Sequence, residues 1–432
     1  MPPRVIDEAA TVVLRPAECT PAHFRVRSHP ARLAAVGRRP LVGHTQARPI
    51  GANVHRILAT WLDGIGVRLV APEDAWLECD HLGRGVDKDA VGFDMAVEYR
   101  PLGRTGVQVS ALCLGCMMFG RRTSPEDSYA IIDRALESGI NFLDTANVYG
   151  RGASEEITGE ALRRNGQRER VVLATKVHGR MMDEDPNAYG NSRRHIIAQC
   201  EASLKRLNTD YIDLYQVHRP EPAVPIDETL RALDDLVRSG KVRYIGTSTF
   251  GAWQVVEALW VSRELGLNRF VSEQPPYNIL DRRIERELVP MAETFGIGLI
   301  PWSPIGGGLL TGKYRRGSNI PSDSRYATEN NPAYEQRLNE RVYDVVERLE
   351  VMAQAKDCTT VQLAVAWVLH QRAISSPIIG PRTMDQLHEY LGASSVRLSP
   401  EDLRQIDELV PPGGMVSPFY QAEFGPHPQR VL

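Results

Sequence analysis

Four side chains suited to proton transfer stand at or just beyond the ends of three successive apolar runs of the chain: Asp144, Tyr149, Lys176 and His218. A tyrosine hydroxyl ionises near pH 10 in water, so it is a weak acid at neutral pH unless a neighbour assists it. An ammonium group about 4 Å away favours the ionised form by roughly 4 kcal/mol at an effective dielectric near 20. The set therefore predicts that Tyr149 donates a proton to a carbonyl oxygen with the help of Lys176.

The lysine stands out because the chain has only six lysines against 45 arginines. Asp144 is the counter-ion expected to keep Lys176 charged when it is partly buried. His218 is expected to donate a hydrogen bond to the substrate oxygen and to orient it. Because the set holds an acid and no nucleophile, the electrons must come from a hydride-carrying cofactor.

The later apolar runs end in residues suited to such a cofactor. Ser248 and Gln274 can hydrogen-bond a carboxamide, and Trp302 offers a flat face to a nicotinamide ring. The glycines that begin at Gly306 let backbone N–H groups approach a diphosphate, and Lys313 adds positive charge. These residues predict a nicotinamide dinucleotide site.

Three features narrow the mode of phosphate binding. Residues 307–313 have the spacing G-x-x-x-x-G-K of an ATP-binding P-loop. Tyr314 stands where such a loop needs Ser or Thr, so we reject an ATPase interpretation. The turn at residues 115–120 lacks G-x-G-x-x-G, so a dinucleotide would not bind in the Rossmann manner. Arg382 precedes a predicted helix and makes a ready phosphate site, which predicts NADP rather than NAD.

Eight strand-like runs alternate with helix-like segments, which predicts a parallel sheet. Eight strands close a (β/α)8 TIM barrel, whose site lies at the carboxyl ends of the strands. A doubly wound open sheet is the alternative, and a hairpin is expected over residues 99–110. The runs cover residues 111–115, 141–146, 171–177, 211–218, 242–248, 270–275, 298–304 and 376–381. The helix candidates include residues 125–138, 154–164, 193–207, 226–239, 252–265 and 285–295, with glycines at 139, 240, 266 and 296 after four of them.

Residues 1–94 differ in composition from the rest of the chain. They hold none of the 14 tyrosines but five of the 11 histidines, and they show no sustained periodicity. We interpret them as a poorly ordered extension or a wrongly assigned start, with a basic nucleic-acid arm as the alternative. Residues 95–432 are then one barrel domain.

A chain that begins at Met95 should therefore keep both its melting temperature and its activity. Differential scanning calorimetry and a reductase assay of the shortened chain test this expectation. Insolubility or lost cofactor binding would show instead that the extension packs on the barrel.

Composition indicates an ordinary globular protein: 42% of the residues are hydrophobic, 24% are charged and the net charge is −3. That balance points to neither nucleic acid nor an anionic membrane as a partner. With no apolar run near 18 residues and no signal-peptide core, a cytoplasmic location is expected. The six cysteines predict free thiols. Cys113 and Cys116 have the C-x-x-C spacing but lack a second ligand pair, so we expect no metal site.

The motifs together resemble the aldo-keto reductase superfamily over residues 97–411, especially the branch of potassium-channel β subunits and bacterial glyceraldehyde-type reductases. The matching stretches are FLDTANVYG (142–150), ATKV (174–177), YIDLYQVH (211–218), WSPI (302–305) and IGPRT (379–383).

By this resemblance, Asp144, Tyr149, Lys176 and His218 form the catalytic tetrad of a reductase that acts on aldehydes or ketones with NADPH. The residues that fall where similar members bind NADPH are Ser248, Gln274, Trp302, Ser303, Ile305, Gly306, Lys313, Arg325, Gly380, Arg382, Gln386 and Glu389. The chain departs from many members at Thr249, where asparagine is common, and at Tyr390, where an asparagine often faces adenine.

Three other functions remain open from the sequence. A keto- or enoyl-reductase of a nucleotide-bound deoxysugar would turn over that sugar and not simple aldehydes. An NADPH-sensing subunit like the channel β subunits would bind NADPH tightly, show negligible catalytic turnover and form a stable complex with a membrane protein. A Schiff-base lyase would leave substrate trapped on Lys176 by borohydride. Substrate choice depends on loops such as residues 181–191 and 315–336.

Overall fold

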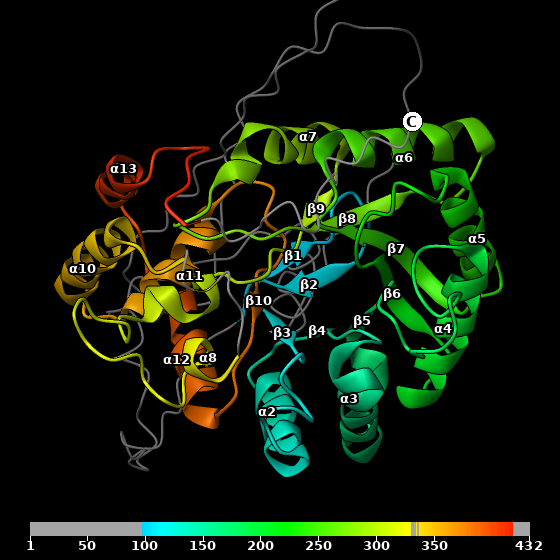
Figure 1. Cartoon of the computed structure of the whole chain (residues 1–432), viewed down its shortest axis with the longest axis horizontal. Helices are drawn as coiled ribbons and strands as arrows, with labels where there is room; N and C mark the ends of the chain where they lie inside the picture. Colours follow the sequence, from blue (N-terminus) through cyan, green and yellow to red (C-terminus); the bar gives the residue numbers. More distant parts are fainter. Residues whose placement is uncertain (1–96, 330–333, 335–336, 418–432) are drawn as a thin grey trace, which may run out of the picture. The chain divides into compact units, whose positions relative to one another are not determined.

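The computed structural model describes residues 97–329, 334 and 337–417, and the predicted extension at residues 1–94 lies outside them. Eight parallel strands form one curled sheet in the order β10-β3-β4-β5-β6-β7-β8-β9, with helices on its outer side (Figure 1). The strands are β3 (Cys113–Gly115), β4 (Phe142–Asp144), β5 (Val172–Val177), β6 (Ile212–Val217), β7 (Val242–Ser248), β8 (Phe270–Gln274), β9 (Gly298–Leu299) and β10 (Ile378–Ile379). All eight predicted strands are confirmed.

The sheet closes on itself between its first and last strands. The backbone nitrogen of Ser375 donates to the Leu299 oxygen at 2.8 Å, and that of Ile378 donates to the Pro301 oxygen at 2.8 Å. These bonds continue the ladder from β9 to the segment that leads into β10. The predicted (β/α)8 barrel is therefore confirmed.

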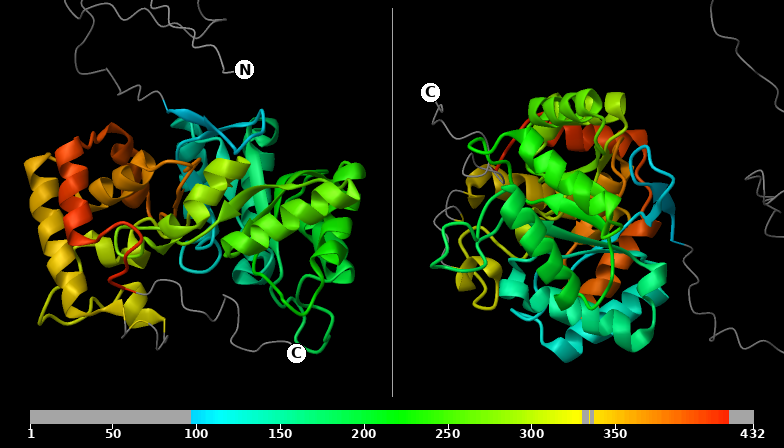
Figure 2. Two further views of the ribbon diagram at one scale, coloured as in Figure 1. Left: turned by 90° about the horizontal axis from the view of Figure 1, so that it is seen from above. Right: turned by 90° about the vertical axis from the view of Figure 1, so that its right-hand side faces the viewer.

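The helices surround the strands, as two further views show (Figure 2). The six predicted helices are present as α2 (Pro125–Glu137), α3 (Ala153–Asn165), α4 (Arg193–Arg206), α5 (Ile226–Arg238), α6 (Ala252–Leu265) and α7 (Leu288–Phe295). The last of these begins later than predicted, because residues 283–286 form a separate 3-10 turn. The chain continues through α8 (Arg325–Thr328), α10 (Glu340–Ala355), α11 (Thr360–His370), α12 (Met384–Gly392) and α13 (Pro400–Leu409).

Local signals explain where these helices begin and end. The Ser124 side chain accepts a hydrogen bond from the Asp127 backbone nitrogen, and Pro125 occupies the first turn of α2, where no intrahelical donor is needed. Gly266 and Gly296 end α6 and α7 at φ values of 65° and 66°. Glycine adopts this left-handed conformation without the steric cost of a Cβ atom.

The predicted hairpin is also confirmed, as β1 (Tyr99–Pro101) paired with β2 (Gln108–Ser110). Its buried Leu102 and Val109 pack with residues at the starts of the barrel strands, such as Phe142. Gly103 sits so close to the barrel that a Cβ atom there would lie 2.5 Å from the Val271 oxygen. The hairpin therefore closes the amino-terminal end of the barrel, opposite the end where catalytic residues are expected.

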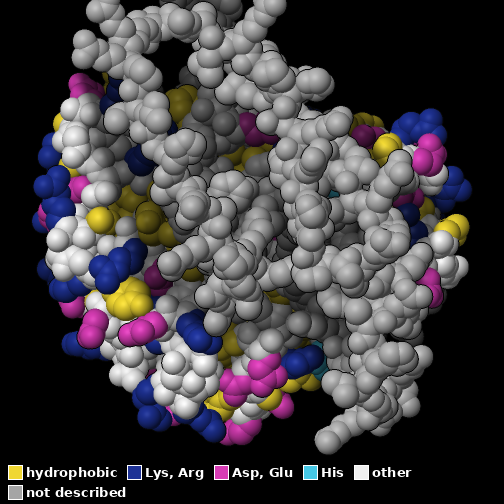
Figure 3. Space-filling view, turned by 180° about the vertical axis from the view of Figure 1, so that it is seen from behind, with side chains coloured by type: hydrophobic (Ala, Val, Ile, Leu, Met, Phe, Trp, Pro, Cys, Tyr) yellow, Lys and Arg dark blue, Asp and Glu magenta, His cyan; other side chains and the backbone are white. Residues whose placement is uncertain are grey.

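The described surface is mixed in charge. Where described side chains are visible from behind, basic and acidic groups alternate rather than separate (Figure 3). Arg316, for example, pairs with Glu340, Asp344 and Glu347. Among the described residues, no helix is long and apolar enough to cross a membrane.

Candidate functional site

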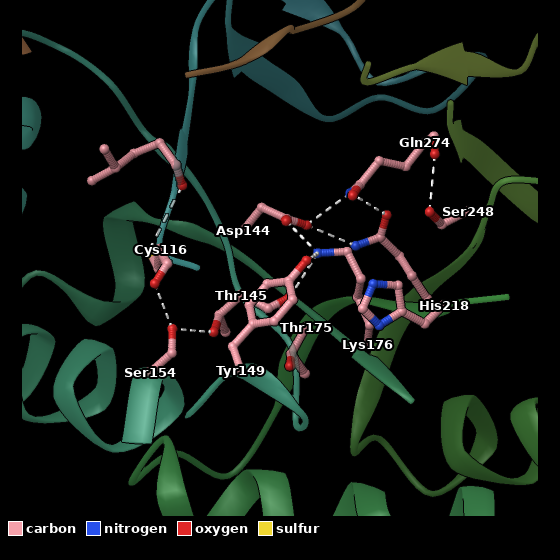
Figure 4. A network of polar contacts seen from close by, with 12 residues as sticks. Cys116, Asp144, Thr145, Tyr149, Ser154, Thr175, Lys176, His218, Ser248 and Gln274 are labelled. Carbon is pink, nitrogen blue, oxygen red and sulfur yellow. Dashed lines mark hydrogen bonds and ion pairs between the residues drawn. The ribbon is translucent and has the colours of Figure 1, made fainter. Parts of the chain in front are cut away.

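The carboxyl ends of β4, β5 and β6 bring the four predicted catalytic side chains together (Figure 4). Asp144 is the last residue of β4, Lys176 is the last but one of β5, and His218 directly follows β6. Tyr149 begins a 3-10 turn after β4, and its hydroxyl points toward the Lys176 amine. The parallel sheet therefore places at one rim residues that lie up to 74 positions apart in sequence.

A buried ion pair forms the centre of this group. The Lys176 side chain is fully buried, and its Nζ pairs with Asp144 Oδ2. The same nitrogen donates to the Thr145 backbone oxygen at 2.9 Å. Burial alone would lower the pKa of Lys176, but the Asp144 carboxylate and the Tyr149 hydroxyl outweigh it, and the pKa is raised above its ordinary value. Lys176 therefore carries a positive charge in the barrel interior.

The Tyr149 hydroxyl lies within reach of that charge. Lys176 Nζ donates to the hydroxyl oxygen at 3.4 Å. The ring of His218 meets the Tyr149 ring edge-on, with centroids 5.6 Å apart and planes at 81°. Burial, followed by the positive charges of Arg219 and Lys176, holds the pKa of His218 well below its usual value. His218 is thus a neutral imidazole that can donate one hydrogen bond.

The turn that presents Tyr149 is sharply folded. Gly150, Arg151 and Gly152 follow it with φ values of 57°, 55° and 106°. A Cβ atom at Gly152 would lie 2.6 Å from Arg206 Cδ, so glycine is required there. The Ser154 hydroxyl donates to the Cys116 oxygen at 2.7 Å and fastens the start of α3 to the end of β3. These contacts fix the direction in which Tyr149 leaves the sheet.

Gln216 is a member of the site that the sequence analysis did not single out. Its Nε2 donates to Asp144 Oδ1 at 3.0 Å, and Gln274 Nε2 donates to the same oxygen at 2.9 Å. Gln274 Nε2 also donates to Gln216 Oε1 at 3.0 Å. The three side chains form a closed buried triangle that ties the acid–base group to a predicted cofactor residue. The only sequence signal for Gln216 is its place two residues before His218, on the same face of the strand.

We expect Gln216→Leu to lower the free energy of unfolding by about 1–3 kcal/mol, because it leaves buried polar atoms of Asp144 and Gln274 short of partners. Gln216→Glu should cost more at neutral pH, since a second carboxylate then faces Asp144. That extra loss should shrink as the pH falls and the new carboxyl group becomes protonated. Urea denaturation of both variants over a range of pH measures this, and equal losses at every pH would contradict it.

A cavity of about 550 Å³ opens at this rim. Two of the predicted residues, Lys176 and Gly306, do not line it. Lys176 is fully buried, and the neighbouring Gly307 and Gly308 line the cavity in place of Gly306. The predicted residues that line it are Asp144, Tyr149, His218, Ser248, Gln274, Trp302, Ser303, Ile305, Lys313, Arg325, Gly380, Arg382, Gln386 and Glu389. The structure thus gathers almost all of the predicted site around one space.

One part of the cavity wall concentrates positive charge. Arg122, Lys313, Arg325 and Arg382 line it together, and we call these four residues the cation cluster. Burial lowers the pKa of Lys313, and the charge of Arg382 is the next largest cause. A Cβ atom at Gly308 would lie only 3.3 Å from Lys313 Nζ, so the glycine leaves room for the amine. Arg325 also pairs with Glu329 at 3.5 Å. Positive groups gathered on one wall favour an anionic ligand, and Arg122 is a member that the sequence analysis missed.

The two cysteines of the C-x-x-C spacing lie in the described part of the chain and act as core residues. Cys113 and Cys116 are free and buried. Burial raises the pKa of the Cys116 thiol to about 12, so it stays protonated at neutral pH. Both act as small core residues.

Comparison with known proteins shows the family of the chain. The model of the aldo/keto reductase family matches residues 111–411. The oxidoreductase YrpG of Bacillus subtilis is 40% identical over 333 residues, which cover 75% of this chain and 99% of that protein. A protein of Oryza sativa named "Probable voltage-gated potassium channel subunit beta" is 38% identical, covering 73% and 97%. Versiconal hemiacetal acetate reductase of Aspergillus parasiticus is 36% identical, covering 72% and 96%. The chain belongs to the aldo/keto reductase family.

Proposed function

We propose that the chain reduces an aldehyde or ketone to an alcohol with NADPH, and catalyses the reverse oxidation, with Tyr149 as the general acid. Family membership makes it an oxidoreductase of small molecules, and nicotinamide cofactors are general in the family. The observation that carries the finer proposal is the Lys176 ammonium. It is buried, paired with Asp144 and 3.4 Å from a hydroxyl on the cavity wall.

The residues of the cavity fit a phosphorylated dinucleotide. The cation cluster offers four positive groups for phosphates, and Arg382 sits at the start of α12, whose N-terminus also favours an anion. Gln274 uses its amide hydrogens on Asp144 and Gln216, so its Oε1 would accept from a carboxamide. Trp302 supplies an aromatic face in the same cavity.

The protein's own groups manage the proton. Tyr149 donates its hydroxyl proton to the substrate oxygen, and the Lys176 ammonium stabilises the phenolate that remains. Asp144 keeps that ammonium charged inside the barrel. Neutral His218 donates a hydrogen bond to the same substrate oxygen and sets its direction. NADPH, when bound, supplies the hydride.

A screen of aldehydes and ketones that follows NADPH absorbance tests the proposal. We expect turnover of at least some simple aldehydes and a preference for NADPH over NADH. Reduction of none of them, with the protein folded and NADPH bound, would refute the proposed activity.

A second candidate function is an NADPH-binding subunit of a membrane complex. The similarity to a protein named as a potassium channel subunit beta is the observation that favours it. A tight NADPH complex with negligible turnover, together with a membrane partner recovered by affinity purification, would support this alternative. The intact set of Asp144, Tyr149, Lys176 and His218 favours the enzyme.

A further inference from the structure

The Asp144 carboxylate fixes the direction of two side-chain amides. Its Oδ2 pairs with Lys176, and its Oδ1 accepts from Gln216 Nε2 at 3.0 Å and from Gln274 Nε2 at 2.9 Å (Figure 4). A carboxylate accepts hydrogen bonds and has no hydrogen to donate, so the amide nitrogens and not the amide oxygens must face it. Neither amide can therefore be turned end for end without losing its bond to Asp144.

Gln216 takes up the second hydrogen of Gln274. Gln274 Nε2 also donates to Gln216 Oε1 at 3.0 Å. A side-chain amide has two N–H hydrogens, so both hydrogens of Gln274 are used inside the barrel. Gln216 is fully buried and does not line the cavity, whereas Gln274 does. What Gln274 can offer a ligand is therefore its Oε1, a hydrogen-bond acceptor.

Ser248 is directed in the same way. Its hydroxyl donates to the Gln274 backbone oxygen at 2.9 Å, and the hydroxyl of the next residue, Thr249, donates to the Ser248 backbone oxygen at 2.7 Å. A serine hydroxyl has one hydrogen, so Ser248 Oγ has only lone pairs left for the cavity that it lines. The two side chains predicted to hold a nicotinamide carboxamide thus both present acceptors.

Two acceptors distinguish between the two ends of a carboxamide. The amino group of a carboxamide carries two N–H donors, whereas its carbonyl oxygen only accepts. Ser248 and Gln274 can each bind the amino group, but a carbonyl oxygen turned toward them would bring acceptor against acceptor. Both residues are nearly inaccessible to solvent, so an acceptor left without a donor there is costly.

We propose that Gln216 is a cofactor-positioning residue, which makes the site recognise the amino group of the nicotinamide carboxamide. This inference rests on the proposed function and adds a residue that does not itself line the cofactor cavity. When Gln216 is lost, Gln274 keeps one anchor, Asp144, and its amide has more freedom to rotate. The acceptor is then held less firmly toward the cavity.

Two analogues of NADP⁺ test which end of the carboxamide is recognised. The 3-acetylpyridine analogue has a methyl group in place of the amino group, and the thionicotinamide analogue keeps the amino group but replaces the carbonyl oxygen with sulfur. We expect the acetylpyridine analogue to bind about 10-fold or more weakly than NADP⁺, because two buried acceptors lose their donors. The thionicotinamide analogue should bind nearly as tightly as NADP⁺. Isothermal titration measures all three affinities without turnover.

Variants of Gln216 test the positioning role. Gln216→Met removes the amide at similar length and should lower the preference for NADP⁺ over the acetylpyridine analogue about 3-fold or more. Gln216→Asn is the milder variant, since it keeps an amide that is one methylene too short to span Asp144 and Gln274, and it should shift the ratio in the same direction. A loss of stability alone would weaken both ligands alike and leave the ratio unchanged.

Gln371→Met is the matched control. Gln371 donates to the Trp367 backbone oxygen at 3.1 Å at the end of α11 and does not line the cavity. The same loss of a side-chain amide should there leave the ratio at the wild-type value.

A wild-type preference against the acetylpyridine analogue that falls in the Gln216 variants, and not in the control, supports the proposal. Equal binding of NADP⁺ and that analogue, equal losses with both analogues, or a preference that both Gln216 variants retain overturns it. If the preference behaves as expected but no aldehyde is reduced, the proposed reductase function fails while the role of Gln216 stands. Aldehyde reduction by a wild type that does not distinguish NADP⁺ from the acetylpyridine analogue refutes the role of Gln216 alone.

Discussion

Tyr149→Phe should lower turnover by at least about 100-fold, because general acids typically contribute roughly 10²–10⁴-fold. The change removes one oxygen and leaves the ring beside His218. The hydroxyl oxygen lies 3.4 Å from Lys176 Nζ, so its removal also breaks the link between the Lys176 ammonium and the substrate oxygen. NADPH affinity should stay close to the wild-type value, since no cofactor contact is assigned to that hydroxyl. Steady-state kinetics and NADPH titration measure the two quantities.

Tyr129→Phe is the control for this experiment. Tyr129 lies on α2, outside the cavity lining, so the same loss of a hydroxyl should leave turnover unchanged. If the Tyr149→Phe enzyme reduces a good aldehyde nearly as fast as the wild type, Tyr149 is not the general acid. The barrel and the cofactor site would survive that result.

Lys176→Met should cause a comparable loss of turnover, because the phenolate left by proton donation loses its stabilising charge. It also leaves the Asp144 carboxylate buried without its partner, which typically costs about 3–5 kcal/mol of stability. The double variant Asp144→Asn/Lys176→Met removes both charges and should regain much of that stability without regaining turnover. Recovery of turnover in the double variant would show that Lys176 acts only through folding.

Arg382→Ala should weaken NADPH binding about 10–150-fold, as expected for a lost charge-assisted contact of roughly 1.5–3 kcal/mol, and leave NADH binding nearly unchanged. The reason is its place in the cation cluster at the start of α12, where an additional phosphate would fit. Isothermal titration with both cofactors measures the difference.

Arg372→Ala is the matched control, because Arg372 is an exposed arginine that does not line the cavity. It should bind both cofactors like the wild type. Equal losses for NADPH and NADH in Arg382→Ala would refute the assignment of Arg382 to the 2′-phosphate and place it on a phosphate that both cofactors share.

Much of this architecture follows from local sequence patterns. Each strand is recognised as a short apolar run, and each helix by its periodicity and by end signals such as Ser124-Pro125 or a following glycine. These signals lie within about 15 residues of one another, and the alternation of strands and helices then follows from their order along the chain. Once the sheet is parallel, every residue at the end of a run comes to the same rim. For that reason the sequence by itself is enough to predict that Asp144, Lys176 and His218 lie together.

Other features depend on contacts between residues far apart in the chain. Gln216 meets Asp144 and Gln274 only because closure of the barrel fixes which inward side chains face one another across its interior. Arg122 joins Lys313 and Arg382 in the cavity wall although it lies far from both in the sequence. Side-chain direction in a loop is set by packing and by the field of distant charges rather than by local periodicity. The four residues proposed to move the proton could therefore be found from the sequence, whereas the place of Gln216 beside Asp144 and of Arg122 in the cation cluster was decided by the tertiary structure, because both depend on contacts between distant parts of the chain.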